Sequence, residues 1–434
     1  MLILGLDIGT TTVSAVVTDG KRVLASKTLK NESFLSNCPT WERAQDAQKI
    51  KEIASRAVYE LLSAYPAVAR IGVTGQQHGI VYLDAAGNAV SPLYTWQDGR
   101  GDLPFDETHS YAAHLSALTD YSLASGYGMV THFYNLENGL VPKSAASFCT
   151  IHDYLAMLLS GRTQPCIDAS DAASFGFFDL ENNCFDLTAV QKAGIDPVLL
   201  PEIAKQPCLG SGTLGIPVFV AIGDNQASFL GATDGENGAM LVNIGTGSQF
   251  SVHAERLTRC AGLETRPFPT GGCLLVGSSL CGGRAYALIE QFFRKTAELV
   301  TGTVQDVCYD AMARALQNNA EPNEVLTFLP LFQGTRENPA LRGSILGIGT
   351  ENFEPLSLLY ALLHGMTDEL FGLYECYRRA GGKSGKLYGS GNGLRKNPTL
   401  CCLFEKTFAQ MLTLSQNEEE AAYGAALFAE SCNI

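Results

Sequence analysis

The chain has few positive charges for its length. Its 434 residues include 30 Lys and Arg against 44 Asp and Glu, which gives a formal net charge of −14 and a pI near 5.0. A protein that binds nucleic acid or an anionic membrane surface through its charge needs a basic face. The charge balance therefore argues against nucleic acid and an anionic membrane as partners. If the protein binds a phosphate-bearing ligand, the positive charge must be concentrated at the binding site.

Other features are also missing from the sequence. No stretch is apolar for the length of a membrane span, and no low-complexity segment or long linker occurs. The thirteen cysteines are spread over the chain without a Cys-x-x-Cys pair, which argues against a disulfide framework. The sequence enters an apolar strand at its second residue, with no signal peptide ahead of it. We therefore expect reduced thiols and a cytoplasmic protein.

Glycine and apolar residues are plentiful. The 44 Gly indicate many tight turns, and a hydrophobic content of 46% is enough for large cores. The length favours two or three domains.

The first pattern with chemical content is residues 2–18, LILGLDIGTTTVSAVVT. Apolar residues alternate on both sides of a Gly/Thr turn, which predicts two strands joined as a hairpin. The turn offers backbone N–H groups and the hydroxyls of Thr10, Thr11 and Thr12 to an anionic oxygen. Asp7, just before the turn, could hold a metal ion bound to that anion. The alternative is an ordinary polar hairpin with an incidental carboxylate.

A second copy of this pattern occupies residues 239–252, AMLVNIGTGSQFSV. Here the turn consists of Gly245, Thr246 and Gly247. Asn243 stands where the first copy has a carboxylate, so only the first hairpin could bind a metal in this way. Two such hairpins about half a chain apart predict two similar α/β domains, which we place at 1–233 and 234–434.

Two polar loops follow predicted strands in the first half of the chain. The loop 75–79 contains Gln77 and His78, and the loop 95–100 contains Trp96, Gln97 and Asp98. Amides and carboxylates bind hydroxyl groups, and an aromatic face covers C–H groups, so the set suits a polyhydroxylated ligand. Taken singly, His78 could cap a loop and Trp96 could belong to the core. Taken together, the residues favour a sugar site.

A carboxylate also follows the predicted strand 218–222. Asp224 stands at the start of a predicted helix, in the polar run Gly223-Asp224-Asn225-Gln226, where open α/β sheets bind ligands. It could be a helix N-cap, but an N-cap does not explain the whole polar run. Asp224 is our candidate general base, in contact with the sugar.

Further elements are expected on either side of these motifs. A third strand is predicted at 22–29, and the polar segment 168–174 is expected to be a loop near the ligand. After a strand at 386–388, glycines would let the backbone approach a flat ligand closely; this segment consists of Gly389, Ser390, Gly391 and Asn392. The last predicted helix, 421–430, has small residues that allow close packing.

Five of these motifs occur in the order found in the FGGY family of carbohydrate kinases, which the chain resembles over nearly its whole length. They begin at Asp7, Gly75, Gly223, Asn243 and Gly389. The resemblance implies an α/β protein with two ribonuclease-H-like domains of the actin/hexokinase ATPase type, with the sugar in the first domain and ATP in a central cleft. Gln77 stands where the family usually has Met.

The resemblance also implies a role for each candidate residue. Asp7 would position Mg²⁺, and Asp224 would be the base. The phosphates of ATP would be held by Thr10, Thr11, Thr12, Gly245, Thr246 and Gly247. The adenosine would contact Gly389, Ser390, Gly391 and Asn392.

Within the family, residues 95–100, 150–154 and 390–394 are most similar to members that act on sedoheptulose, and next to members that act on xylulose. The expected function is phosphorylation of a primary hydroxyl of a ketose by Mg·ATP, by a monomer or homodimer. A non-catalytic, actin-like ATP-binding sensor would need the hairpins but neither Asp224 nor the sugar loops. A sugar-responsive regulator would bring a basic DNA-binding segment, and none is visible.

Overall fold

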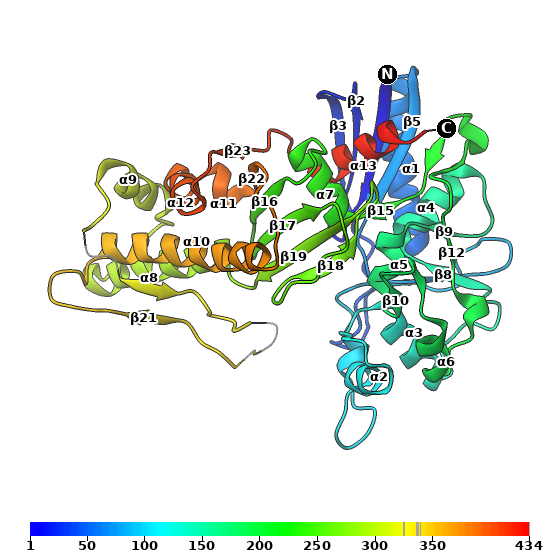
Figure 1. The fold of residues 1–434 in the computed structure, drawn as a ribbon, viewed down its shortest axis with the longest axis horizontal. Helices are drawn as coiled ribbons and strands as arrows, with labels where there is room; N and C mark the ends of the chain where they lie inside the picture. The colour runs from blue at the N-terminus through cyan, green and yellow to red at the C-terminus, as the bar shows by residue number, and fades with distance from the viewer. Residues whose placement is uncertain (324–325, 336–337, 339, 434) are drawn as a thin grey trace. The chain divides into compact units, whose positions relative to one another are not determined.

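The computed structural model describes residues 1–323, 326–335, 338 and 340–433. Contacts divide the chain into two compact units, many of whose elements are labelled in Figure 1. Unit 1 consists of Met1–Gly235, Arg266–Gly272 and Asn417–Ile434, and unit 2 of Glu236–Thr265 and Cys273–Gln416. The chain first passes from unit 1 to unit 2 after Gly235, close to the predicted boundary between residues 233 and 234. The C-terminal helix, in contrast, belongs to unit 1 by its contacts.

Unit 1 is built on a sheet with the strand order β13-β14-β5-β1-β2-β3. The hairpin predicted at 2–18 is confirmed: β1 (Leu2–Ile8) and β2 (Thr12–Thr18) pair antiparallel. The predicted third strand is β3 (Val23–Lys30), which continues this meander. On the other side of β1 lies β5 (Val68–Gly75), parallel to it.

The strand predicted at 218–222 is divided into two short strands, β14 (Val218–Phe219) and β15 (Ile222–Gly223). Both pair parallel with β5. In the register of the sheet, Asp7 and Ile222 both stand beside Thr74. The carboxyl ends of β1, β5 and β15 are therefore level. Asp7, the loop after Gly75 and Asp224 lie together at this edge of the sheet, where the three strands end.

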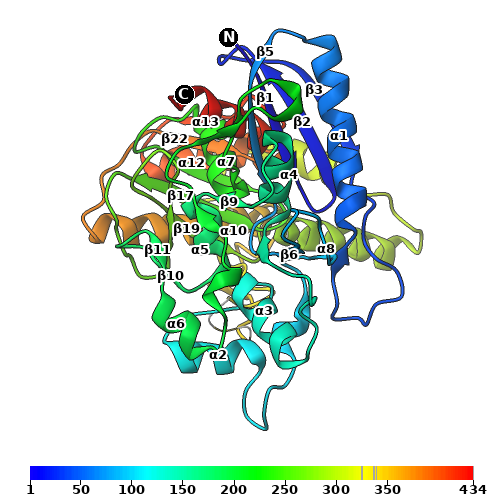
Figure 2. The ribbon, with the colours of Figure 1, turned by 90° about the vertical axis from the view of Figure 1, so that its right-hand side faces the viewer.

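Helices cover both faces of this sheet. In Figure 2, α1 (Ala47–Ala64) and α13 (Glu420–Ser431) lie on opposite sides of the strands. The latter packs against α7 (Asp224–Thr233), β1 and β5. The approach is close, because a Cβ atom at Gly5 would lie 1.8 Å from the carbonyl oxygen of Ala422, and one at Gly72 would lie 1.9 Å from that of Ala425. The close packing predicted for this helix is confirmed.

This contact gives a stability prediction. Gly72→Ala should destabilise the protein by about 1–3 kcal/mol, the usual cost of overpacking, because the backbone of α13 must move. The matched control is Gly372→Ala on the exposed surface of α10 (Pro355–Arg379), where a Cβ would meet nothing within 4 Å and helix propensity favours Ala by up to about 1 kcal/mol. Thermal melting of the two variants should move in opposite directions. An unchanged Tm in Gly72→Ala would contradict the close contact.

Unit 2 contains a sheet with the strand order β18-β19-β17-β16-β22-β23. The second predicted hairpin is confirmed as β16 (Met240–Ile244) and β17 (Ser248–Ala254), an antiparallel pair. The strand β22 (Leu387–Ser390) runs parallel to β16. The other elements described in this unit are β18 (Glu264–Pro267), whose last two residues belong to unit 1, β19 (Cys273–Ser279), α8 (Gly283–Thr301), α9 (Tyr309–Asn318), β20 (Thr327–Leu329), β21 (Ser344–Leu346), α11 (Asn392–Arg395), α12 (Pro398–Phe408) and β23 (Leu412–Leu414).

The rest of unit 1 consists of short elements that carry the loops of the site. One of them corrects an expectation: residues 168–174, predicted as a loop, lie mainly in α5 (Ala169–Phe175), which Asp168 caps. The others are β4 (Ala44–Gln45), β6 (Val81–Leu83), β7 (Leu93–Tyr94), α2 (Tyr111–Thr119), α3 (Gly128–Glu137), β8 (Ser147–Cys149), α4 (Ile151–Ser160), β9 (Cys166–Ile167), β10 (Phe178–Asp179), β11 (Cys184–Phe185), α6 (Leu187–Lys192), β12 (Glu202–Ile203) and β13 (Cys208–Gly210).

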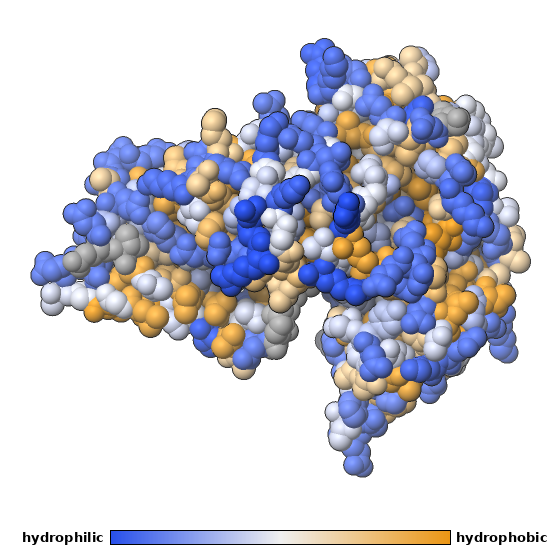
Figure 3. Space-filling model, in the orientation of Figure 1, coloured by the Kyte–Doolittle hydropathy of each residue, from blue (hydrophilic) through white to orange (hydrophobic). Residues whose placement is uncertain are grey.

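The surface and the thiols agree with the composition. Among the residues that the structure describes, no helix combines the length and the apolar character that crossing a bilayer requires. On the face drawn in Figure 3, hydrophilic side chains cover most of the surface and hydrophobic ones form small separate groups. The thirteen cysteines, all of them within the described ranges, are free.

Candidate functional site

The turn of the first hairpin is tied to both predicted sugar loops by one hydrogen-bond network. The hydroxyl of Thr10 donates to Gln76 Oε1 at 3.1 Å and accepts from Trp96 Nε1, also at 3.1 Å. Gln45 Nε2 donates to the carbonyl oxygen of Thr10, and Gln76 Nε2 donates to Gln45 Oε1. The predicted phosphate hairpin and the loops 75–79 and 95–100 are thus brought together. The hydroxyl of Thr10 is occupied in this network, whereas Thr11 is exposed.

His78 is held from two sides. Its Nδ1 lies 2.7 Å from the carbonyl oxygen of Ser174, and since a carbonyl oxygen only accepts, Nδ1 carries the proton. The imidazole stacks on Tyr127, with 4.6 Å between ring centroids and 10° between planes. Its backbone has φ 72°, in the left-handed region. This anchoring presents the imidazole in one orientation and one tautomer.

Trp96 and Gln97 lie at the surface of their loop. The indole of Trp96 is 47% exposed, so the alternative of a core aromatic residue is wrong. Gln97 is also exposed. Gln77, in contrast, is buried, and its Nε2 donates to the carbonyl oxygen of Ser170 at 3.2 Å and to Asp171 Oδ1 at 3.4 Å. Gln77 therefore contacts the layer beneath the loop.

The carboxylate of Asp98 is used within the protein. It is 1% exposed, and its oxygens accept from the backbone N–H of Arg43 at 2.9 Å and from Arg100 Nε at 2.6 Å. The guanidinium of Arg100 lies over the ring of Tyr94, 4.0 Å from the centroid. A buried charge pair of this kind fixes a loop firmly. The structure thus gives Asp98 a positioning role in which both of its oxygens are engaged.

Asp224 is the first residue of α7 and lies at the edge of the sheet defined above. The N-cap position belongs to Gly223, and no side chain caps this helix, so the interpretation of Asp224 as an N-cap is wrong. Asn225 Nδ2 donates to Asp224 Oδ1 at 3.0 Å. Burial raises the pKa of Asp224, while His152, Arg266 and the hydrogen bonds from Asn225 oppose that shift. A carboxylate with a raised pKa is better suited to accept a proton near neutral pH.

Asp7 lies at the same edge, among other carboxylates. Burial, followed by repulsion from Asp224 and Glu419, raises its pKa to about 7. Glu419 stands just before α13 and accepts a hydrogen bond from the hydroxyl of Thr28 at 2.6 Å. Oxygen ligands of this kind are those that Mg²⁺ prefers, and a cation would relieve their repulsion. The residues around Asp7 therefore fit a magnesium ion.

In unit 2, the second hairpin and the glycine-rich segment line one pocket of about 1250 Å³. Gly245 and Thr246 lie on its wall, together with Gly391 and Asn392. Beside them stands the N-terminus of α8, where the N–H groups of Gly283 and Arg284 donate to the carbonyl oxygens of Gly245 and Thr246. Other residues of the wall are Tyr286, Tyr309, Leu363, Met366, Lys396, Asn397 and Leu400. The pocket combines polar loops with an apolar wall, as a nucleotide site does.

The other predicted residues of this unit lie next to the pocket. Gly247 lines a neighbouring pocket of about 420 Å³. Ser390 is fully buried, and its hydroxyl accepts a hydrogen bond from Asn243 Nδ2, which joins β22, including Gly389, to the hairpin. Gly391 has φ 87°, and a Cβ there would lie 2.4 Å from the carbonyl oxygen of Ile244. Only glycine allows this approach.

Several residues of the two sites were missed in the sequence. They include Tyr127 beside His78, Glu419 and Arg266 around the two carboxylates, and the stacked pair Tyr286 and Tyr309 in the pocket. None belongs to a local motif, because each comes to its place from a distant segment. The one available signal was Gly282-Gly283-Arg284 ahead of an amphipathic helix.

Residues 2–231 match the N-terminal domain of the FGGY family of carbohydrate kinases, and residues 240–431 match its C-terminal domain. The chain belongs to the FGGY family. It is therefore an ATP-dependent sugar kinase with the two-domain fold of that family, related to actin and hexokinase.

Individual FGGY proteins resemble it along their whole length. It is 28% identical to the sedoheptulokinase of Mus musculus, over 98% of this chain and 96% of that protein. It is 24% identical to the xylulose kinase of Haemophilus influenzae, over 99% and 90%. Among solved structures, the xylulose kinase of Rhodospirillum rubrum has a TM-score of 0.83 at 22% identity, covering 99% of this chain and 90% of that one.

Proposed function

We propose that this FGGY kinase transfers the γ-phosphoryl group of Mg·ATP to a primary hydroxyl of a ketose, with sedoheptulose as its substrate and sedoheptulose 7-phosphate as its product. The observation that carries the proposal is the convergence in unit 1: a carboxylate with a raised pKa, Asp224, at the sheet edge that also holds Asp7 and the loop of His78. The similarity to sedoheptulokinases over nearly the full chain supports the choice of sugar.

In this proposal, domain 1–233 binds the sugar and supplies the base and the first phosphate turn, and domain 234–434 supplies the second phosphate turn and binds the adenosine. His78, Trp96 and Gln97 contact the sugar, with Gln77 and Asp98 holding their loops. Asp224 accepts the proton of the attacking hydroxyl, and its oxygen is oriented by Asn225. The phosphates lie against the turns Thr10–Thr12 and Gly245–Gly247, and the adenosine lies against Gly389–Asn392.

A magnesium ion bound with ATP at Asp7 would neutralise negative charge on the phosphates. The backbone N–H groups of the two turns add partial positive charge of their own, and so does the dipole of α8, although the N–H groups of Gly283 and Arg284 already donate within the protein. Such local sources are what an acidic protein with a net charge of −14 requires. Exclusion of water from the assembled site favours transfer to the sugar over hydrolysis of ATP. We expect the enzyme to act in the cytoplasm as a monomer or homodimer.

The test is a panel of acceptors assayed with ATP. Sedoheptulose should have a higher kcat/KM than D-xylulose, D-ribulose or glycerol, because a site that hydrogen-bonds the extra hydroxyls leaves its polar groups stranded when a shorter sugar binds. Each stranded group costs roughly 1–3 kcal/mol, so the preference should exceed about 10-fold. A preference for D-xylulose would make the protein a xylulokinase. ATP binding without phosphorylation of any sugar would support a non-catalytic sensor.

A further inference from the structure

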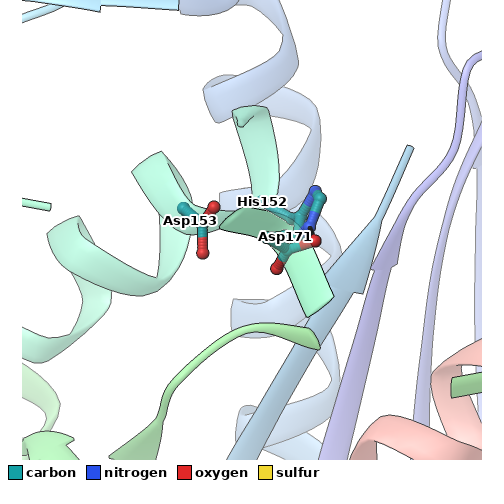
Figure 4. A group of neighbouring side chains, drawn as sticks. All are labelled: His152, Asp153 and Asp171. Carbon is teal, nitrogen blue, oxygen red and sulfur yellow. Dashed lines mark ion pairs between the residues drawn. The ribbon is translucent and has the colours of Figure 1, made fainter. Parts of the chain in front are cut away.

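A cluster of buried ionisable side chains lies beneath the sugar loops. His152 and Asp153 come from α4, and Asp171 comes from α5. Figure 4 shows the side chains of His152 and Asp171 close together and that of Asp153 a little apart from them. Their exposed fractions are 0%, 1% and 0%. Three ionisable groups without access to water need compensation from one another or from a ligand.

The three side chains do not compensate one another by hydrogen bonds. His152 Nε2 lies only 3.0 Å from Asp171 Oδ1, yet neither ring nitrogen has a hydrogen-bond partner among the described residues. Asp153 Oδ1 and Asp171 Oδ2 likewise have no partner within the described ranges. Buried polar atoms are normally paired, so four orphaned atoms in one cluster require an explanation.

The spacing of the atoms suits a metal ion. One ligand atom from each of the three residues lies within 4.8 Å of the others. Ligands about 2.0–2.2 Å from a cation lie roughly 3–4 Å apart, so a small rotation of the side chains closes the site. The surroundings already orient the ligands: Thr150 Oγ1 donates to Asp153 Oδ2 at 2.7 Å, and Gln77 Nε2 lies 3.4 Å from Asp171 Oδ1. Such outer partners are characteristic of metal sites.

We propose that His152, Asp153 and Asp171 form a buried binding site for a divalent transition-metal cation of the Zn²⁺ type. One imidazole and two carboxylates are ligands that Zn²⁺ accepts, and the imidazole disfavours Mg²⁺. This site is distinct from Asp7, and none of its three ligands is a proposed contact of the sugar or of ATP. It ties α4 to α5 and so fixes Gln77 and Ser170, whose hydroxyl accepts a hydrogen bond from the N–H of Gly223 at 3.2 Å. The cation would support the backbone directly before Asp224.

The experiment measures metal in the full-length protein, prepared without a histidine tag and without nucleotide. After exposure to Zn²⁺ and gel filtration in metal-free buffer, elemental analysis should find about one Zn²⁺ per chain, and the bound Zn²⁺ should raise Tm. His152→Ala and Asp171→Asn should each weaken Zn²⁺ binding more than about 10-fold.

The matched control is His109→Ala, in an exposed cluster where His109 Nδ1 lies 3.3 Å from Asp106 Oδ1; it should keep the bound Zn²⁺. The wild-type metal content does not depend on how well any variant folds. Wild-type protein that retains no Zn²⁺ would overturn the proposal and leave the three side chains in their neutral forms, because burial lowers the pKa of His152 and raises the pKa of Asp153 and of Asp171. Equal retention by a folded His152→Ala variant would overturn it as well.

Discussion

Asp224→Asn is expected to lower kcat at least about 100-fold, the usual contribution of a positioned base, while the KM values for sugar and ATP change little. Asn keeps the size of the side chain and can still contact Asn225, but it cannot accept the proton of the attacking hydroxyl. Because burial raises the pKa of Asp224, the acidic limb of the kcat/KM profile of the unchanged enzyme should lie above the ordinary pKa of an aspartate. The limb should disappear in the variant.

The matched control lies at the other end of the same helix. Asp234→Asn changes the exposed C-cap of α7, which has φ 50°, a conformation that Asn tolerates well. Its kcat should stay near that of the unchanged enzyme. Near-normal turnover in Asp224→Asn would remove Asp224 from the role of base, whereas the family assignment would stand.

The hairpins were predictable because their signal is local. Apolar residues alternate on both sides of a Gly/Thr turn, and this fixes the register of the two strands because a shift by one residue would expose the apolar face. Both hairpins occur within a residue or two of the expected positions. The asymmetry between Asp7 and Asn243 was visible for the same reason. The structure adds an assignment for Asn243, which donates a hydrogen bond to Ser390.

The partners of the loop residues could not be predicted, because they come from distant segments. Asp98 accepts from the N–H of Arg43, and nothing in the sequence around Asp98 indicates that contact. The hydroxyl of Thr10 joins Gln76 and Trp96 in the same way. The residue types indicated a polar site correctly, but which of them face a ligand depends on these tertiary hydrogen bonds.

Local sequence patterns also could not predict that the last helix packs in unit 1. Its small residues predicted close packing without specifying a partner. That partner is a row of glycines on β1, β5 and α7, including Gly5, Gly72 and Gly231. These glycines lie in three different elements and are far apart in the sequence. Only the folded structure shows that they contact the same helix. One consequence is that Glu419, directly before this helix, reaches the carboxylates at the sheet edge.

Asp7→Asn is expected to impair catalysis and to stabilise the protein. Kcat should fall at least about 100-fold and its dependence on Mg²⁺ should weaken, because an amide is a poor ligand for this cation. The folded-state pKa of Asp7, about 7, is above the ordinary 3.8, so the folded chain binds more protons than the unfolded chain between these values. Stability of the unchanged protein therefore falls as the pH rises from about 4 to 7, by up to roughly 4 kcal/mol from this group.

Without divalent cation or nucleotide, Asp7→Asn should consequently have a higher Tm than the unchanged protein at pH 8, and the difference should shrink at pH 5. The matched control is Asp19→Asn in the turn between β2 and β3, where hydrogen bonds from the backbone of Lys21 and Arg22 lower the pKa of the carboxyl. That variant should gain no stability at pH 8. An Asp7→Asn protein with the pH dependence of the unchanged chain and full activity would make Asp7 an incidental carboxylate. If Asp7 is a cation ligand held among other carboxylates, its replacement by Asn must raise stability in the absence of cation and lower turnover.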